Sequence, residues 1–115
     1  MKKIFIVHGW GGRPNEPWLA WLKKELENRG MAVVVPEMPD PENPKIEAWV
    51  LHLSQVVGLP DANTCFVGHS IGCQTILRYL QTLNTQVGQV VFVAPWFSLK
   101  EDSYESDEER AIAKP

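Results

Sequence analysis

Histidine is scarce in this chain of 115 residues, and its placement is more informative than its number. The histidines are His8, His52 and His69, and none follows residue 69. Cysteine is scarcer still, with only Cys65 and Cys73. Two cysteines form neither a disulfide framework nor a zinc knuckle. We therefore expect buried free thiols, no metal site and a reducing, cytoplasmic location.

Long apolar runs and an excess of basic residues are also missing. The first apolar run, residues 4–7, is too short for a signal peptide, and no run approaches the length of a membrane span. The net charge is −3 and the basic residues are scattered, which disfavours nucleic acid and membranes as partners. With 44% apolar and 22% charged residues, the composition is typical of one small globular domain.

Strand-like and helix-like segments alternate along the chain. Apolar runs rich in β-branched residues predict four strands, at residues 3–7, 31–35, 64–67 and 87–93. Apolar residues at helical spacing predict three helices, at residues 18–28, 45–57 and 71–83. Such alternation predicts an α/β fold with a parallel sheet, and nearly continuous apolar strands are typical of sheets buried on both faces.

The third predicted strand runs directly into Gly68-His69-Ser70-Ile71-Gly72, where the third helix begins. A serine in this setting is held on a strained turn, with its hydroxyl at the carboxyl edge of the sheet. The two glycines permit the turn and a close approach of helix and strand. Ser70 is therefore the predicted nucleophile, and the N–H of Ile71 is the predicted first donor to an oxyanion. The alternative is a plain glycine-rich turn.

The first predicted strand ends in a second glycine-bearing loop, His8-Gly9-Trp10-Gly11-Gly12. This loop is similar to the oxyanion loop of esterases and lipases, in which glycines let the backbone approach a substrate carbonyl. The predicted second donor is the amide of Trp10, with Gly11 as the alternative. We favour a role for His8 in holding the loop over a role in proton transfer.

Five segments of the sequence resemble the small serine hydrolases grouped with retinoblastoma-binding protein 9. They are VHGWGG, WLAWLKKELENRG, PEMPDPENP, VGHSIGCQTILRYL and VVFVAPW. The resemblance extends from Lys3 to about the end of the chain. It implies an α/β-hydrolase core and a cytoplasmic enzyme that cleaves a small ester or amide through Ser70, without a cofactor.

The resemblance also implies a strand order of second, first, third, fourth. This order leaves the apolar fourth strand, Val90–Val93, at an edge of the sheet. Because exposed apolar edges pair with other copies of a chain, we expect a homo-oligomer built through this strand.

One departure from the family concerns the partners of the nucleophile. In the family the triad acid and histidine follow the serine, whereas no histidine follows Ser70 here. Asp102 and Asp107 do follow it, but a carboxylate does not replace the imidazole that takes the hydroxyl proton. We therefore expect an N-terminal hydrolase core at residues 1–99, then an acidic tail or the start of a missing C-terminal segment at residues 100–115. Turnover by this chain alone should be weak or nil.

Two other functions are alternatives to hydrolysis. A non-catalytic protein-interaction module that keeps the hydrolase fold would need neither acid nor base, so it stays open. A nucleotide or phosphate site at the HGWGG loop is disfavoured, because the sequence lacks both the lysine of a Walker loop and a G-x-G-x-x-G pattern.

The tryptophans fall into two groups by position. Trp18, Trp21 and Trp49 lie in predicted helices and are expected mainly in the core. Trp10 and Trp96 follow strand ends, where α/β proteins bind ligands, so each is equally compatible with a ligand pocket and with the core.

Overall fold

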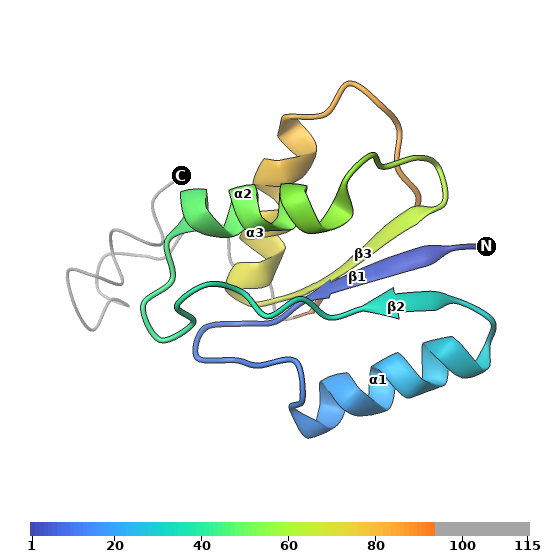
Figure 1. Ribbon diagram of the computed structural model, residues 1–115, viewed down its shortest axis with the longest axis horizontal. Coiled ribbons are helices and arrows are strands. Elements are labelled where there is room, and N and C mark those ends of the chain that lie inside the picture. The colour runs from blue at the N-terminus through green and yellow to red at the C-terminus, as the bar shows by residue number, and fades with distance from the viewer. Residues whose placement is uncertain (94–115) are drawn as a thin grey trace.

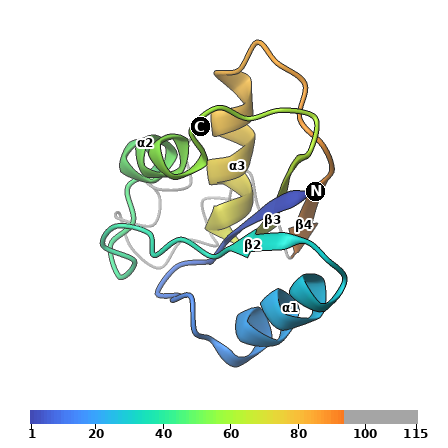
Figure 2. The same cartoon turned by 45° about the vertical axis from the view of Figure 1, so that its right-hand side comes forward.

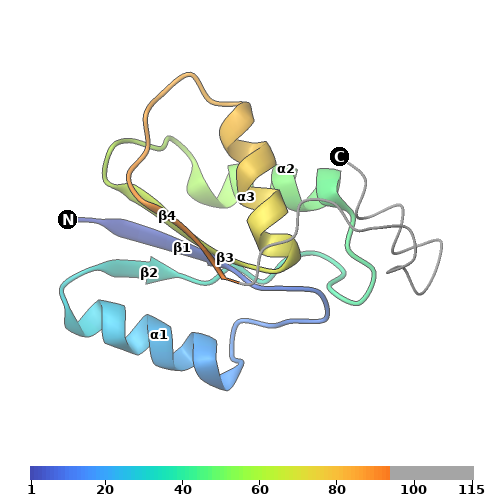
Figure 3. The same ribbon diagram turned by 180° about the vertical axis from the view of Figure 1, so that it is seen from behind.

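The computed structural model describes residues 1–93 as a parallel sheet between two layers of helices (Figure 1). The strands are β1 (Lys3–Val7), β2 (Ala32–Val34), β3 (Thr64–His69) and β4 (Val90–Val93). The helices are α1 (Pro17–Asn28), α2 (Ile46–Val57) and α3 (Ile71–Gln81). Helix α1 covers one face of the sheet, and α2 and α3 cover the other (Figures 2 and 3). Trp96 and the predicted segment 100–115 lie outside the described residues.

The sheet has the order β2-β1-β3-β4, and every neighbouring pair is parallel. This confirms the predicted α/β class and strand order. Two strands are shorter than predicted, β2 by two residues and β4 by three. Just before β4 the chain already lies beside β3, because the Gly88 N–H donates to the carbonyl of Thr64 at 2.8 Å. A Cβ at Gly88 would lie 2.8 Å from the Cys65 sulfur and 2.9 Å from the carbonyl oxygen of Ala62, so glycine permits this close approach.

The core has two parts because β1 is buried on both faces. Phe5 and Val7 point toward α2 and α3, whereas Ile4 and Ile6 point toward α1. This explains the unbroken apolar run of the first strand. The larger part contains Phe5, Val7, Met38, Trp49, Leu53, Phe66, Ile71, Ile76 and Tyr79. The smaller part contains Ile4, Ile6, Leu19, Val33 and Cys65.

The tryptophan prediction was partly wrong. Trp49 is fully buried, but Trp21 is 62% exposed. Helix α1 turns Leu19 inward, and two residues later the chain has rotated by about 200°, so Trp21 faces outward. Both cysteines are buried and free, as predicted.

One face of β4 is apolar and partly open. Val91 is 52% exposed and Val93 is 38% exposed, whereas Val90 and Phe92 pack against the α2 and α3 side of the core. The predicted homo-oligomer through this strand stays a prediction. Within residues 1–93, no helix combines the length and the apolar character that crossing a membrane requires.

Glycine at position 72 sets how closely α3 approaches β1. A Cβ added there would overlap the carbonyl oxygen of Val7 and lie 2.9 Å from that of His8. Both contacts are with backbone, which cannot move aside without shifting the strand. The close packing of the first turn of α3 on β1 therefore depends on Gly72.

We predict that Gly72→Ala lowers the free energy of unfolding by about 1–3 kcal/mol, the usual cost of overpacking. Alanine would otherwise stabilise a helix interior by roughly 0.5–1 kcal/mol, so the clash must outweigh this gain. Urea denaturation followed by circular dichroism measures the change. Gln55→Ala, on an exposed position of α2, is the control and should stay within about 0.5 kcal/mol of the wild type. Equal midpoints for the two variants would contradict the packing argument.

Candidate active site

Ser70 occupies the turn between β3 and α3 and has a strained backbone. Its φ is 57° and its ψ is −121°, a region that residues with a side chain rarely adopt. Such strain costs on the order of 1–3 kcal/mol and persists only where surrounding contacts hold it. The Ser70 N–H donates to the carbonyl of Val93 at 3.2 Å, and the Cys73 N–H donates to the carbonyl of Ser70 at 3.0 Å. The turn is thus held by β4 on one side and by α3 on the other.

Both glycines around the serine are required by their surroundings. A Cβ at Gly68 would lie 2.9 Å from the backbone of Cys73 and from the side chain of Ile76. At Gly72 it would overlap the end of β1, as described above. The glycines therefore let α3 start immediately after β3 and lie directly against the sheet, which leaves Ser70 at the carboxyl edge.

Strand pairing places the two sequence motifs side by side. In the β1–β3 register Val7 is opposite Gly68, so both loops leave the same edge of the sheet. A Cβ at Gly9 would lie 3.3 Å from the Cβ of Ser70 and 2.9 Å from Nδ1 of His69. The glycine-bearing loop therefore packs directly on the turn that carries Ser70.

The hydrogen bonds of this loop distinguish between the two predicted donors. The Gly11 N–H donates to the carbonyl of Pro41 at 2.7 Å, so it is not free to bind an oxyanion. The Trp10 N–H has no acceptor among residues 1–93. Ile71 is the first residue of α3, so its N–H has no intrahelical acceptor. Of the two candidates, the geometry favours Trp10 over Gly11.

His8 is fully buried and uses both ring nitrogens inside the protein. Its Nε2 accepts a hydrogen bond from the Met38 N–H at 3.2 Å, so this nitrogen carries no proton. Nδ1 must then carry the proton and donate to the carbonyl of Gly9 at 3.0 Å. The edge of the ring also contacts Trp49, with 5.3 Å between centroids. A histidine in this state holds the loop and has no free nitrogen to accept a proton.

The other two histidines lie in different surroundings. The ring of His69 makes an edge contact with Trp18 of α1, with 5.2 Å between centroids, which places it toward the α1 side of the sheet. His52 is half-buried on α2. We assign none of these three histidines as the base for Ser70.

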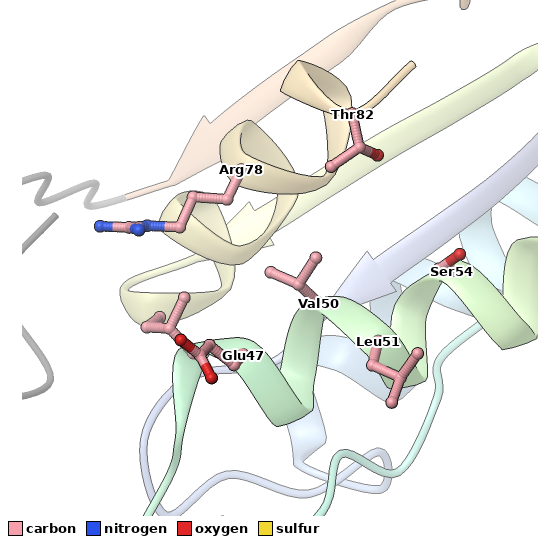
Figure 4. Close-up of a pocket in the computed structure, with 7 residues that line it drawn as sticks. Glu47, Val50, Leu51, Ser54, Arg78 and Thr82 are labelled. Atoms are coloured by element: carbon pink, nitrogen blue, oxygen red, sulfur yellow. The ribbon is translucent and has the colours of Figure 1, made fainter.

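A separate groove of about 500 Å³ runs between α2 and α3 (Figure 4). Side chains of the two helices face each other across it, including Glu47 from α2 and Arg78 from α3. Its other lining residues are Ile46, Val50, Leu51, Ser54 and Thr82. The groove contains none of the predicted site residues, so it does not belong to the site at Ser70.

Sequence reasoning missed one part of the site, the loop after β2. The main chain of residues 38–42 contacts the glycine-bearing loop at three points: Met38 with His8, Pro41 with Gly11, and Glu42 with Trp10. Residues 38–42 contribute only backbone atoms to these contacts, and backbone atoms carry no signature of residue type. The density of proline in PDPENP was the available signal, because it indicates a rigid loop.

We predict that His8 makes the protein less stable as the pH falls below neutrality. Burial lowers the pKa of His8 below its ordinary value of 6.5, and the hydrogen bond to the Gly9 carbonyl and the charges of Glu16 and Glu37 oppose this only in part. The unfolded chain therefore takes up a proton near pH 6.5, while the folded protein does so only at lower pH. The contribution of His8 to the free energy of unfolding is therefore complete above pH 6.5. It is lost as the pH falls from there toward the pKa of His8 in the folded state.

Melting temperatures at pH 7.5 and pH 5.5 measure this effect. His8→Gln should show a smaller drop between the two pH values than the wild type, because its side chain does not titrate. His52→Gln is the control and should keep the wild-type drop. An equal drop in His8→Gln and the wild type would show that His8 is not responsible.

Comparison with known proteins places these features in a family. The sequence profile of the serine hydrolase family matches residues 4–113. The putative hydrolase YdeN of Bacillus subtilis is 36% identical over 95 residues, which are 81% of this chain and 50% of YdeN. The serine hydrolase RBBP9 of Rattus norvegicus is 30% identical over 99 residues, 84% of this chain and 52% of that protein.

A solved structure agrees with these sequence matches. The crystal structure of the ydeN gene product superimposes with a TM-score of 0.88 at 28% identity, covering all of this chain and 61% of that one. The match confirms the α/β-hydrolase fold. The chain spans about half the length of the curated relatives it matches. The strained serine turn, the glycine-bearing loop beside it and the profile match agree: the chain belongs to the serine hydrolase family.

Proposed function

We propose that Ser70 is the nucleophile of an esterase-like hydrolase acting on small carboxylic esters or amides in the cytoplasm. The observation that carries this proposal is the strained φ of 57° at Ser70, at a strand-to-helix turn against which Gly9 packs. A non-glycine residue is held in this conformation where its exposure at the sheet edge serves a purpose. The YdeN and RBBP9 matches support the same chemistry, since both are named hydrolases.

The proposed reaction is acyl transfer through a covalent intermediate. The Ser70 hydroxyl oxygen adds to the substrate carbonyl carbon while a base takes its proton, and the carbonyl electron pair moves onto oxygen. The amides of Ile71 and Trp10 would donate to this oxyanion, and the N-terminal end of α3 adds positive potential. Collapse expels the alcohol or amine, which takes the proton from the base. Water then adds to the acyl carbon and gives a proton to the base, and a second collapse releases the acid while Ser70 takes the proton back.

His8 has both ring nitrogens engaged, and the His69 ring packs toward α1. We therefore propose that the base for Ser70 comes from outside residues 1–93. An oxyanion hole without its base retains only a small part of a full triad's rate enhancement, so this chain by itself should turn over esters weakly or not at all.

A second candidate function is a protein-interaction module that keeps the hydrolase fold. The observation that favours it is the apolar face of β4, where Val91 and Val93 are exposed and Val93 pairs with His69 beside the Ser70 turn. This candidate needs no chemistry at Ser70, so covalent labelling distinguishes the two.

We predict that a fluorophosphonate probe adds once to the folded protein, at Ser70, and that Ser70→Ala abolishes the adduct. The reason is that the turn and the two amides are already assembled around the serine. Intact mass spectrometry over several hours measures the adduct, because labelling should be slow without a resident base. Ser54→Ala, an exposed serine of α2, is the control and should label like the wild type.

Two results would contradict the proposal in different ways. A folded protein that gains no adduct would favour the interaction module. Ester turnover at the rate of an ordinary esterase, lost in Ser70→Ala, would confirm the nucleophile but show that a base is present after all.

A further inference from the structure

The main chain of the loop after β2 makes three hydrogen bonds to the glycine-bearing loop, although about thirty residues separate them in the chain. The Met38 N–H donates to Nε2 of His8 at 3.2 Å. The Gly11 N–H donates to the carbonyl of Pro41 at 2.7 Å. The Trp10 indole N–H donates to the carbonyl of Glu42 at 3.2 Å. We call residues 38–42 the strap.

We propose that the strap is a positioning element that fixes the direction of the Trp10 main-chain N–H at the Ser70 turn. This inference rests on the proposed function, because it assigns that N–H to the oxyanion. The strap touches no reacting atom in this account. It acts through His8, Trp10 and Gly11.

The direction of the Trp10 N–H follows from the planarity of its peptide bond. The Gly9 carbonyl and the Trp10 N–H belong to one trans peptide, so they point in opposite directions. The Gly9 oxygen accepts from Nδ1 of His8 at 3.0 Å and from the Gly12 N–H at 3.0 Å. These two bonds fix the carbonyl, and the Trp10 N–H must then face the other way.

The strap acts on both ends of this arrangement. At one end, Met38 bonds to the ring nitrogen of His8 that faces away from Gly9, which sets both the tautomer and the ring orientation. At the other end, Pro41 holds the next peptide through the Gly11 N–H. Gly11 has a φ of +67°, which a residue with a side chain rarely adopts, so the loop can bend to meet the strap at this point.

The strap itself is stiff and anchored. Its prolines, Pro39 and Pro41, have φ fixed by their rings. Asp40 between them has a positive φ of 46°, and its carbonyl accepts from the Asn43 N–H at 3.0 Å. The carbonyl of Pro39 accepts from the indole of the buried Trp49 at 2.7 Å, which ties the strap to α2. A rigid segment holds its partner in place at a lower entropic cost than a flexible one would.

Trp10→Phe tests the inference because it removes the indole N–H and keeps the main-chain amide. We expect hydrogen exchange at the Gly11 amide to accelerate about fivefold, the factor that corresponds to one lost hydrogen bond of about 1 kcal/mol. Fluorophosphonate labelling of Ser70 should slow by a similar factor. Trp21→Phe, at an exposed position of α1, is the matched control and should change neither rate.

Pro41→Gly is a second variant that keeps the acceptor carbonyl but loosens the strap. It should also accelerate exchange at Gly11 and slow labelling, with Pro60→Gly in a separate loop as its control. Melting temperatures are recorded for all four variants. Labelling rates that follow melting temperature instead of Gly11 exchange would contradict positioning and indicate a general loss of stability.

The remaining outcomes separate this inference from the proposed function. Equal hydrogen-exchange rates of the Gly11 amide in Trp10→Phe and Trp21→Phe would show that the strap does not hold the glycine-bearing loop. Faster exchange with an unchanged labelling rate would overturn its role in positioning the donor. A wild-type protein that is never labelled would contradict the proposed function and the positioning role with it, whereas the exchange rates would still show whether the strap holds the loop.

Discussion

The pairing of β1 with β3, with Val7 opposite Gly68, is the constraint on which the site depends. Parallel neighbours end at the same edge of a sheet, so the loops that follow them meet there. One loop carries glycines and the Trp10 amide, and the other carries Ser70. A slip of one residue would exchange Phe5 and Val7, which pack against α2 and α3, with Ile4 and Ile6, which pack against α1. Because each set fits its own part of the core, this packing fixes the geometry of the site as well as the core.

The strain at Ser70 is held by the elements around it. An unfavourable φ costs on the order of 1–3 kcal/mol, comparable to one or two net hydrogen bonds. The Val93 carbonyl accepts from the Ser70 N–H at 3.2 Å, and the Cys73 thiol lies 3.6 Å from the same oxygen. The edge strand β4 therefore has a role in holding the turn. Glycine at positions 68 and 72 completes the turn by removing the two side chains that would keep α3 away from the sheet.

Much of this arrangement could be predicted from the sequence, because its signals are local. The strand-like runs, the helical spacing and the G-x-S-x-G turn each lie within one short segment, and the parallel α/β class and strand order followed from them and from the family resemblance. The predicted burial of Trp21 was wrong because a helix with several apolar residues has more than one plausible inner face. Only the packing against the sheet selects which face is buried. The choice between Trp10 and Gly11 was open because it depends on a hydrogen bond to Pro41, thirty residues away along the chain. Backbone contacts of this kind leave no mark on residue type.

The central claim is that the serine turn and the glycine-bearing loop are assembled side by side within this chain. The most direct measurement is a nuclear Overhauser effect between the Hα protons of Gly9 and the Hβ protons of Ser70, recorded on the isotope-labelled protein in solution. Strong cross-peaks are expected, because a Cβ built at Gly9 would lie 3.3 Å from the Ser70 Cβ. A folded protein that shows the β1–β3 cross-peaks but none between Gly9 and Ser70 would contradict this assembly, since the sheet would then form without bringing the two loops together.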